Sequence, residues 1–164
     1  MSVTYIVAND EAAKSITALR RMVWETTYRG IYADELIDKY DYEGYKQRDL
    51  LRLRDPSYHV YLIKDADTPI GYLMFSDTGV VHIQALYILQ AYQQRGIGRR
   101  AFALIRQYCR EHGFREFTCN CNAHNLPAQG FYRAMGGVEI KRDEGHDDKR
   151  DDQITFSFRV DDRN

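Results

Sequence analysis

The residues best placed to do chemistry lie in the segment Gln93-Gln94-Arg95-Gly96-Ile97-Gly98, between an apolar strand and an amphipathic helix. Glycine lets the backbone turn tightly and lets a ligand approach it closely. A helix start also presents unpaired N–H groups and a partial positive charge. This segment therefore predicts a seat for a phosphate-bearing ligand.

Three cations crowd the same helix start, namely Arg95, Arg99 and Arg100. Exposed cations there oppose the helix dipole by about 0.3–1 kcal/mol each, whereas Asp or Glu would favour it. A bound polyanion would remove this conflict. The alternative interpretation is a solvated basic turn with a pair of loop glycines.

Hydrophobic periodicity and turn residues indicate the elements that must position this loop. Strands are expected at 2–8, 59–64, 70–75, 80–89, 114–121, 138–142 and 154–160, and helices at 11–25, 33–54 (interrupted near Gly44), 98–112 and 125–135. This order predicts an α/β fold, with a mixed sheet and helices on its faces. The unit at 80–121 should be a right-handed parallel crossover. No linker or repeat interrupts the chain, so a single domain over 1–164 is expected.

Composition limits the function classes. The chain has 164 residues, 44% hydrophobic and 29% charged, with a net charge of −1. This balance does not favour nucleic-acid binding, although four arginines at 95–106 leave it as a weak alternative. No apolar run approaches the roughly 20 residues that span a membrane, and the N-terminus lacks the features of a signal peptide. We therefore expect a cytoplasmic protein with no membrane partner.

The cysteines Cys109, Cys119 and Cys121 are odd in number and follow no signal peptide, which indicates reduced thiols. No second Cys/His pair has zinc-site spacing. We interpret all three as small buried apolar residues and expect no metal.

The glycine loop resembles the acetyl-CoA loop of the GCN5-related N-acetyltransferase (GNAT) family, Gln/Arg-x-x-Gly-x-Gly/Ala. A second stretch, Asn125–Gly137, is similar to the family's Asn-x-x-Ala-x-x-Phe-Tyr helix that closes on glycine. Family members often carry proline at the place of Gln90. The resemblance covers residues 58–160 well and the first 55 loosely. It implies an acyltransferase with a twisted mixed sheet flanked by helices on both faces, which uses acetyl-CoA and releases CoA.

The resemblance also implies how the donor is held. The loop N–H groups would bind the pyrophosphate, and the backbone of 86–88 would pair with the pantetheine arm like an added strand. By analogy with the family, the N–H of Ile88 would polarise the thioester carbonyl. The cofactor-binding residues implied are Leu86, Tyr87, Ile88, Gln93, Gln94, Arg95, Gly96, Ile97, Gly98, Arg99 and Asn125.

Two residues are expected to move protons. Tyr132 matches the family's tyrosine near the CoA sulfur, and a phenol with an ordinary pKa near about 10 can donate a proton; packing is its alternative role. Many family members place a glutamate on the fourth strand, and this chain has none there. Alternation would put His82 and Gln84 on one face with Leu86, which makes His82 a candidate base. A structural His82, a water relay or a partly neutral amine remain alternatives.

Two regions are expected to shape the acceptor site. Trp24, Tyr28 and Tyr32 would form a cage for a cationic or apolar group, or the core of a loop. The segment 143–152, with six acidic residues, would attract a polycation, or be a solvated mobile loop.

The predicted reaction is acetyl transfer to a primary amine of a small molecule or polyamine. A protein N-terminal or lysine acetyltransferase and a non-catalytic acyl-CoA sensor are the alternatives. Many relatives dimerise, so a homodimer is left open.

Overall fold

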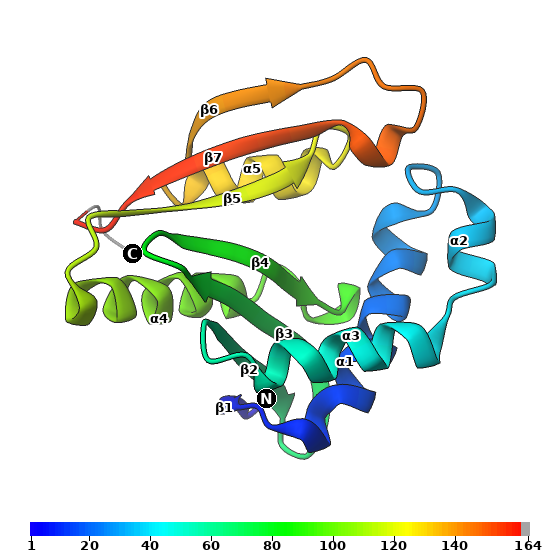
Figure 1. Ribbon diagram of the computed structural model, residues 1–164, viewed down its shortest axis with the longest axis horizontal. Coiled ribbons are helices and arrows are strands. Elements are labelled where there is room, and N and C mark those ends of the chain that lie inside the picture. Colours follow the sequence, from blue (N-terminus) through cyan, green and yellow to red (C-terminus); the bar gives the residue numbers. More distant parts are fainter. Residues whose placement is uncertain (162–164) are drawn as a thin grey trace.

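The computed structural model describes residues 1–161 and contains a seven-stranded sheet in the order β1-β2-β3-β4-β5-β7-β6 (Figure 1). The strands are β1 Val3–Val7, β2 Tyr58–Asp65, β3 Thr68–Asp77, β4 Val81–Ile88, β5 Glu116–Asn122, β6 Val138–Asp143 and β7 Gln153–Arg159. The helices are α1 Ala13–Val23, α2 Asp34–Asp38, α3 Tyr42–Arg54, α4 Ile97–His112 and α5 Leu126–Ala134. A π-helical turn, Trp24–Tyr28, extends α1. The predicted order of elements and the mixed sheet are confirmed.

The interruption that we predicted near Gly44 is wrong. α3 runs through Gly44, and the break between α2 and α3 lies at residues 39–41. Asp41 caps α3 by accepting a hydrogen bond from the Gly44 N–H at 2.9 Å. Because an N-cap carboxylate satisfies an otherwise unpaired N–H, the glycine sits in the first turn without ending the helix.

The sheet splits between β4 and β5. These two strands run parallel and share only two register pairs, His82 with Thr118 and Ile83 with Cys119. Beyond these pairs they diverge (Figure 1). A β-bulge lies at the point of divergence, because consecutive β3 residues pair with Ala85 and Ile83 and leave Gln84 as the extra residue. A bulge bends and twists the strand that carries it, which opens the sheet here.

The bulge also reverses which side chains face α4. Ile83 lies in the core cluster beneath α4, and Leu86 packs against the same cluster, whereas Ala85 packs on the α1 side. Our expectation that His82 and Gln84 share a face with Leu86 is therefore wrong. One inserted residue shifts the alternation, so His82 and Leu86 point to opposite faces.

Two apolar layers cover the sheet. The first is beneath α4 and contains Phe102, Ile105, Phe117 and Phe158, and the second lies beneath α1. All three cysteines are buried, as predicted. Gly113 ends α4 in the left-handed conformation, which is the expected C-terminal glycine. In the described part of the chain, no helix combines the length and apolar character that crossing a membrane requires.

Candidate active site

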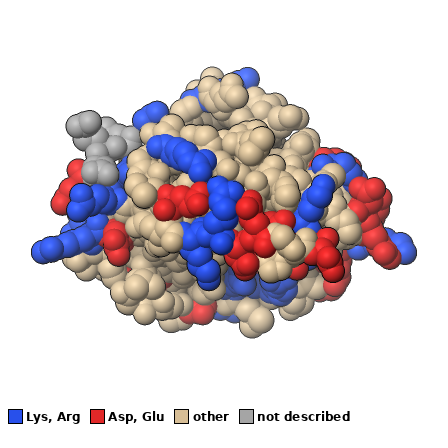
Figure 2. Space-filling view, turned by 90° about the horizontal axis from the view of Figure 1, so that it is seen from above, with Lys and Arg blue, Asp and Glu red and all other residues tan. Residues whose placement is uncertain are grey.

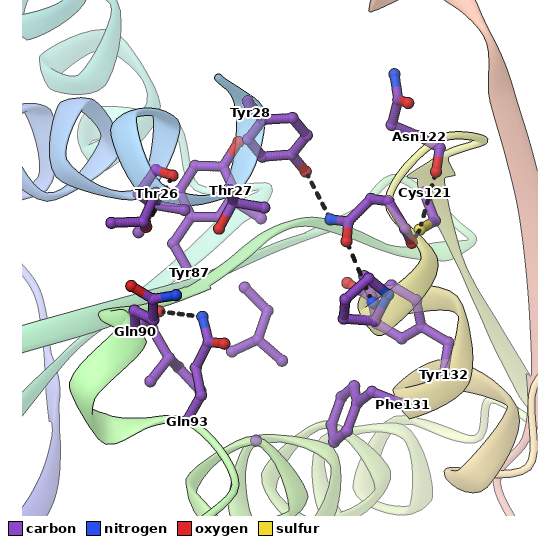
Figure 3. A pocket seen from close by; sticks show the side chains of 18 of the residues that line it. Thr26, Thr27, Tyr28, Tyr87, Gln90, Gln93, Cys121, Asn122, Phe131 and Tyr132 are labelled. Atoms are coloured by element: carbon purple, nitrogen blue, oxygen red, sulfur yellow. Dashed lines mark hydrogen bonds between the residues drawn. The ribbon is translucent and has the colours of Figure 1, made fainter. Parts of the chain in front are cut away.

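A cavity of about 720 Å³ occupies the split between β4 and β5. Its walls come from the end of α1 with the segment that follows it, the second half of β4, the glycine loop, the end of β5 and the start of α5. The parts of the sequence that carried the predicted site are therefore brought together around one space. Figure 3 shows Gln90 and Gln93 on one side of this space and Cys121 and Asn122 on the other.

The two loop glycines serve different purposes. Gly96 has φ +81°, and a Cβ added there would have no neighbour within 4 Å. The left-handed backbone at this position favours glycine, and the space beside Gly96, in front of the start of α4, is open. Gly98 instead lies against Phe131, since a Cβ there would come 2.8 Å from the Phe131 Cζ atom. Together they leave the start of α4 open to a ligand and pack it against α5.

The three arginines at the start of α4 point to different surroundings. Arg99 lines the cavity. Arg95 lies over the Tyr92 ring, 5.5 Å from its centroid, and Arg100 donates to the Val3 carbonyl at 3.0 Å. Arg95 is therefore the one predicted cofactor-binding residue that does not line the cavity, whereas Leu86, Tyr87, Ile88, Gln93, Gln94, Gly96, Ile97, Gly98, Arg99 and Asn125 all do.

After Ile83, β4 has no described strand paired with it on the side of the cavity. The Leu89 N–H donates to Ile70 of β3 at 2.9 Å, so the backbone groups of Leu89 face β3. Successive residues of a strand face opposite sides, so those of Ile88 and Leu86 face the split. The Ile88 carbonyl accepts from the Gln93 side chain at 3.0 Å, which fits this direction. The Ile88 N–H faces the same way as its carbonyl, toward the split.

Tyr132 lines the cavity from α5. Burial raises the pKa of its hydroxyl well above the ordinary value, and the neighbouring thiols of Cys119 and Cys121 add to the shift. Its ring lies among those of Phe102, Phe131 and Phe158. A phenol in this environment stays protonated through the neutral pH range.

Asn125 connects two walls of the cavity. Its side-chain oxygen accepts from the Ala128 N–H at 3.2 Å and caps α5. Its side-chain nitrogen donates to the Tyr28 hydroxyl at 3.4 Å (Figure 3). The Tyr28 ring is stacked on that of Tyr32, with centroids 4.4 Å apart. Asn125 therefore ties the start of α5 to the aromatic segment after α1.

The three predicted substrate-contacting aromatics do not act alike. Tyr28 and Tyr32 line the cavity, whereas Trp24 is 3% exposed and packs in a core with Ile37. The guanidinium of Arg150 lies 5.2 Å from the Tyr32 centroid and 5.8 Å from that of Trp24. The rings of Trp24 and Tyr32 therefore contact a cation of the chain itself, Arg150, where we had expected a cationic substrate.

Arg150 comes from the segment 144–152 between β6 and β7, here called the β6–β7 segment. Asn122 at the end of β5 donates to the Lys149 carbonyl at 2.9 Å. Asp152 is buried, accepts from the His146 N–H at 3.0 Å and lies 2.7 Å from the His124 Nε2 atom. The interpretation of 143–152 as a wholly solvated loop is therefore wrong at its end, which packs against β5 and the aromatic rings.

The acidic residues near this segment do not form one negative field. Seen from above, acidic and basic side chains lie interspersed (Figure 2). Arg142 bonds both Glu139 and Glu144, at 2.7 and 2.8 Å, and Arg133 also reaches Glu139. Neighbouring cations thus neutralise part of the charge that was expected to attract a polycation.

His82 lies away from the cavity lining. Its Nδ1 atom is 2.7 Å from the Thr118 hydroxyl, across the two-residue β4–β5 ladder. Burial lowers its pKa. Sequence reasoning did not single out the polar residues Asn120, Asn122, His124 and Gln153, which line the far end of the cavity. A cluster of polar residues directly before the Asn125 motif was the available signal.

Comparison with known proteins agrees with this geometry. The model of the acetyltransferase (GNAT) family matches residues 16–136. No curated protein is similar enough in sequence to match. A PaiA N-acetyltransferase from Thermoplasma acidophilum, solved with coenzyme A, has a TM-score of 0.81 and 19% identity over 97% of this chain and 99% of its own.

Two further structures share the fold. An acetyltransferase from Thermus thermophilus has a TM-score of 0.72 and 23% identity, over 97% of each chain. The protein yncA from Salmonella typhimurium, solved with its cofactor acetyl-CoA, has a TM-score of 0.65 and 19% identity, over 99% of this chain and 96% of its own.

Proposed function

This chain belongs to the acetyltransferase (GNAT) family, and from this premise we propose that it transfers the acetyl group of acetyl-CoA to the primary amine of a small molecule. The observation that carries the proposal is the cavity in the split sheet. One end holds an uncapped helix start and Arg99, the middle holds the free edge of β4 and Tyr132, and the far end is polar.

The donor end suits a pyrophosphate. The start of α4 has no side-chain cap, so its first N–H groups are available, and Gly96 leaves the space before them open. Arg99 adds a cation on the same wall. The free β4 edge can pair with an extended, amide-containing arm in the manner of an added strand. The residues present therefore fit acetyl-CoA.

The reacting centre lies where that arm would end. In this proposal the Ile88 N–H, on the free edge of β4, donates to the oxygen of the thioester carbonyl as negative charge develops on it. As the N–C bond forms and the C–S bond breaks, Tyr132 is the group to protonate the departing sulfur. The second proton of the attacking amine then restores the phenol, so the step balances.

The acceptor end favours a small amine. In the described part of the chain, no Asp or Glu lines the cavity, so a polyamine would find no carboxylate for its second cation. Arg150 further disfavours a polycation at this end. The β6–β7 segment is held beside the acceptor end, because the lining residues Asn122 and Gln153 donate to its Lys149 and Arg150 carbonyls, each at 2.9 Å. This neighbour supports a small molecule over a protein N-terminus or lysine.

The test is calorimetric titration with acetyl-CoA, followed by thiol release in the same sample. The acceptors are simple monoamines, amino acids, spermidine and a peptide with a free N-terminus. We expect binding, with the fastest thiol release for a small monoamine. Faster thiol release with spermidine would indicate a polyamine acceptor, and faster release with the peptide would indicate a protein N-terminus. Binding without release for every amine would favour the non-catalytic sensor, and no binding would overturn the proposal.

A further inference from the structure

A histidine and a carboxylate form a pair at the acceptor end of the cavity. His124 lines this end, and its Nε2 atom lies 2.7 Å from the Asp152 Oδ2 atom. The His124 side chain is 38% exposed and that of Asp152 is 6% exposed, so the pair runs from the cavity into the protein. We infer that His124 accepts the proton of the incoming ammonium group and that Asp152 positions its imidazole, an inference that rests on the acetyl transfer proposed above.

The composition of the cavity wall supports this role by elimination. An alkylammonium must lose a proton before its nitrogen can attack, so an acceptor of protons is required. In the described part of the chain, the wall contains no carboxylate, and the pKa values of its tyrosine hydroxyls are raised, so these groups stay protonated. The guanidinium of Arg99 offers only donors. Burial raises the pKa of the Cys121 thiol to about 12, so that thiol is protonated as well. Histidine is the remaining type of side chain, and His124 supplies it.

The hydrogen bonds to Asp152 select the tautomer of His124 that can accept a proton from the amine. Its Oδ1 atom accepts from the His146 N–H at 3.0 Å, which leaves Oδ2 for His124. A carboxylate only accepts, so the neutral imidazole carries its proton on Nε2 and keeps a lone pair on Nδ1. The His124 N–H donates in turn to the Asn122 side chain at 2.9 Å, which fixes the backbone that carries the ring. Asp152 is thus a positioning residue.

The proton has a complete path. The ammonium gives one proton to His124, and the neutral amine then attacks the thioester as described for Tyr132. His124 returns its proton to solvent through its exposed side. The other charged groups near the pair belong to the β6–β7 segment, where His146, bonded to Asp143 at 2.9 Å, and Asp151 are the ionisable neighbours.

The first experiment compares His124→Ala with His112→Ala, each measured with the best primary amine of the panel. His112 lies on α4, bonded to the Tyr108 carbonyl at 2.8 Å, and serves as the matched control. We expect His124→Ala to lower kcat roughly 100-fold or more, the usual range for a general base. Acetyl-CoA binding should stay unchanged. The loss should be smaller with hydroxylamine, which is already neutral, and free imidazole should restore part of the rate.

The second experiment uses Asp152→Asn. Its oxygen can keep the bond to the His146 N–H, while its amide would donate to the His124 Nε2 atom and move the ring proton to Nδ1. We expect a lower kcat with unchanged acetyl-CoA binding and loss of the acidic limb of the pH–rate profile.

Specific outcomes would overturn the inference. His124 would be rejected as the base if His124→Ala kept the acidic limb of the native pH–rate profile. It would also be rejected if kcat fell in His82→Ala and not in His124→Ala. An equal loss for hydroxylamine without imidazole rescue would make His124 structural. If the unaltered protein acetylates none of the amines, the proposed function fails first, and that result is distinct from the others.

Discussion

The side chain of Asn125 spans the cavity wall between α5 and the Tyr28 hydroxyl, which it reaches at 3.4 Å. The same side chain caps α5 through the Ala128 N–H. One residue thereby fixes the helix that carries Tyr132 and the aromatic segment on the acceptor side. The resemblance implied a role in cofactor binding, and the geometry supplies a second role in holding the site together.

Asn125→Ala should lower the free energy of unfolding by about 1 kcal/mol, the usual cost of a lost N-cap. Asn125→Asp keeps the acceptor for the Ala128 N–H and should lose much less. Tyr28→Phe removes only the link across the cavity and should leave stability close to that of the native protein. Urea unfolding of the three variants measures this, and equal stability of Asn125→Ala and Asn125→Asp would contradict the capping role.

Gly96→Asp should abolish acetyl-CoA binding. The carboxylate would enter the open space before the start of α4 and repel the pyrophosphate. The left-handed backbone also costs any side chain roughly 1–2 kcal/mol. Gly113→Asp is the matched control, because Gly113 has φ +79° at the other end of α4 and equally open space. Calorimetry should show normal binding for the control, and binding by Gly96→Asp would reject the phosphate seat.

Tyr132→Phe should lower kcat by roughly 100-fold, within the range for a lost general acid, and leave the Kd for acetyl-CoA unchanged. Because burial raises the pKa of this phenol, it stays protonated as the pH rises through the neutral range. Tyr132 should therefore cause no alkaline fall in rate near neutral pH. The control is Tyr108→Phe, because the Tyr108 hydroxyl lies outside the cavity and donates to Asp77 at 2.6 Å. Equal activity of both variants would assign Tyr132 to packing.

The elements that sequence predicted well are those with a strong local signal. The apolar strand, glycine loop and amphipathic helix around Gly96 follow from hydrophobic period and turn chemistry. The Asn125 cap was equally visible. The break between α2 and α3 was misplaced because the Asp41 cap makes Gly44 tolerable, and propensity alone does not include that bond.

The remaining site residues depend on contacts between distant segments. The bulge at Gln84 leaves no mark in the pattern of the strand, yet it decides that His82 and Leu86 face opposite sides. The pairing of His124 with Asp152 joins residues 28 positions apart. Arg150 lies over Tyr32 only because the β6–β7 segment folds back. Local patterns cannot show any of these three.

Acid should remove the stability that Asp152 provides. The bond with His124, followed by that from the His146 N–H, holds the pKa of Asp152 below its ordinary value. A carboxyl with a lowered folded pKa stabilises the protein above its unfolded pKa, near about 3.9, and this stability is lost as the pH falls through the folded value. Urea unfolding of the native protein and Asp152→Asn should therefore differ at neutral pH and converge below about pH 4. A constant difference would contradict the linkage.

Arg150→Glu should change which amines are accepted. The guanidinium over Tyr32 and Trp24 places a positive charge beside the acceptor end, whose wall lacks Asp and Glu in the described part of the chain. A carboxylate there would offer a partner for a second ammonium group. The ratio of kcat/KM for spermidine to that for a monoamine should therefore rise, with unchanged acetyl-CoA binding. Arg150→Gln removes the cation without adding an anion, so its ratio should lie between the two. An unchanged ratio in both variants would show that Arg150 plays no part in acceptor choice.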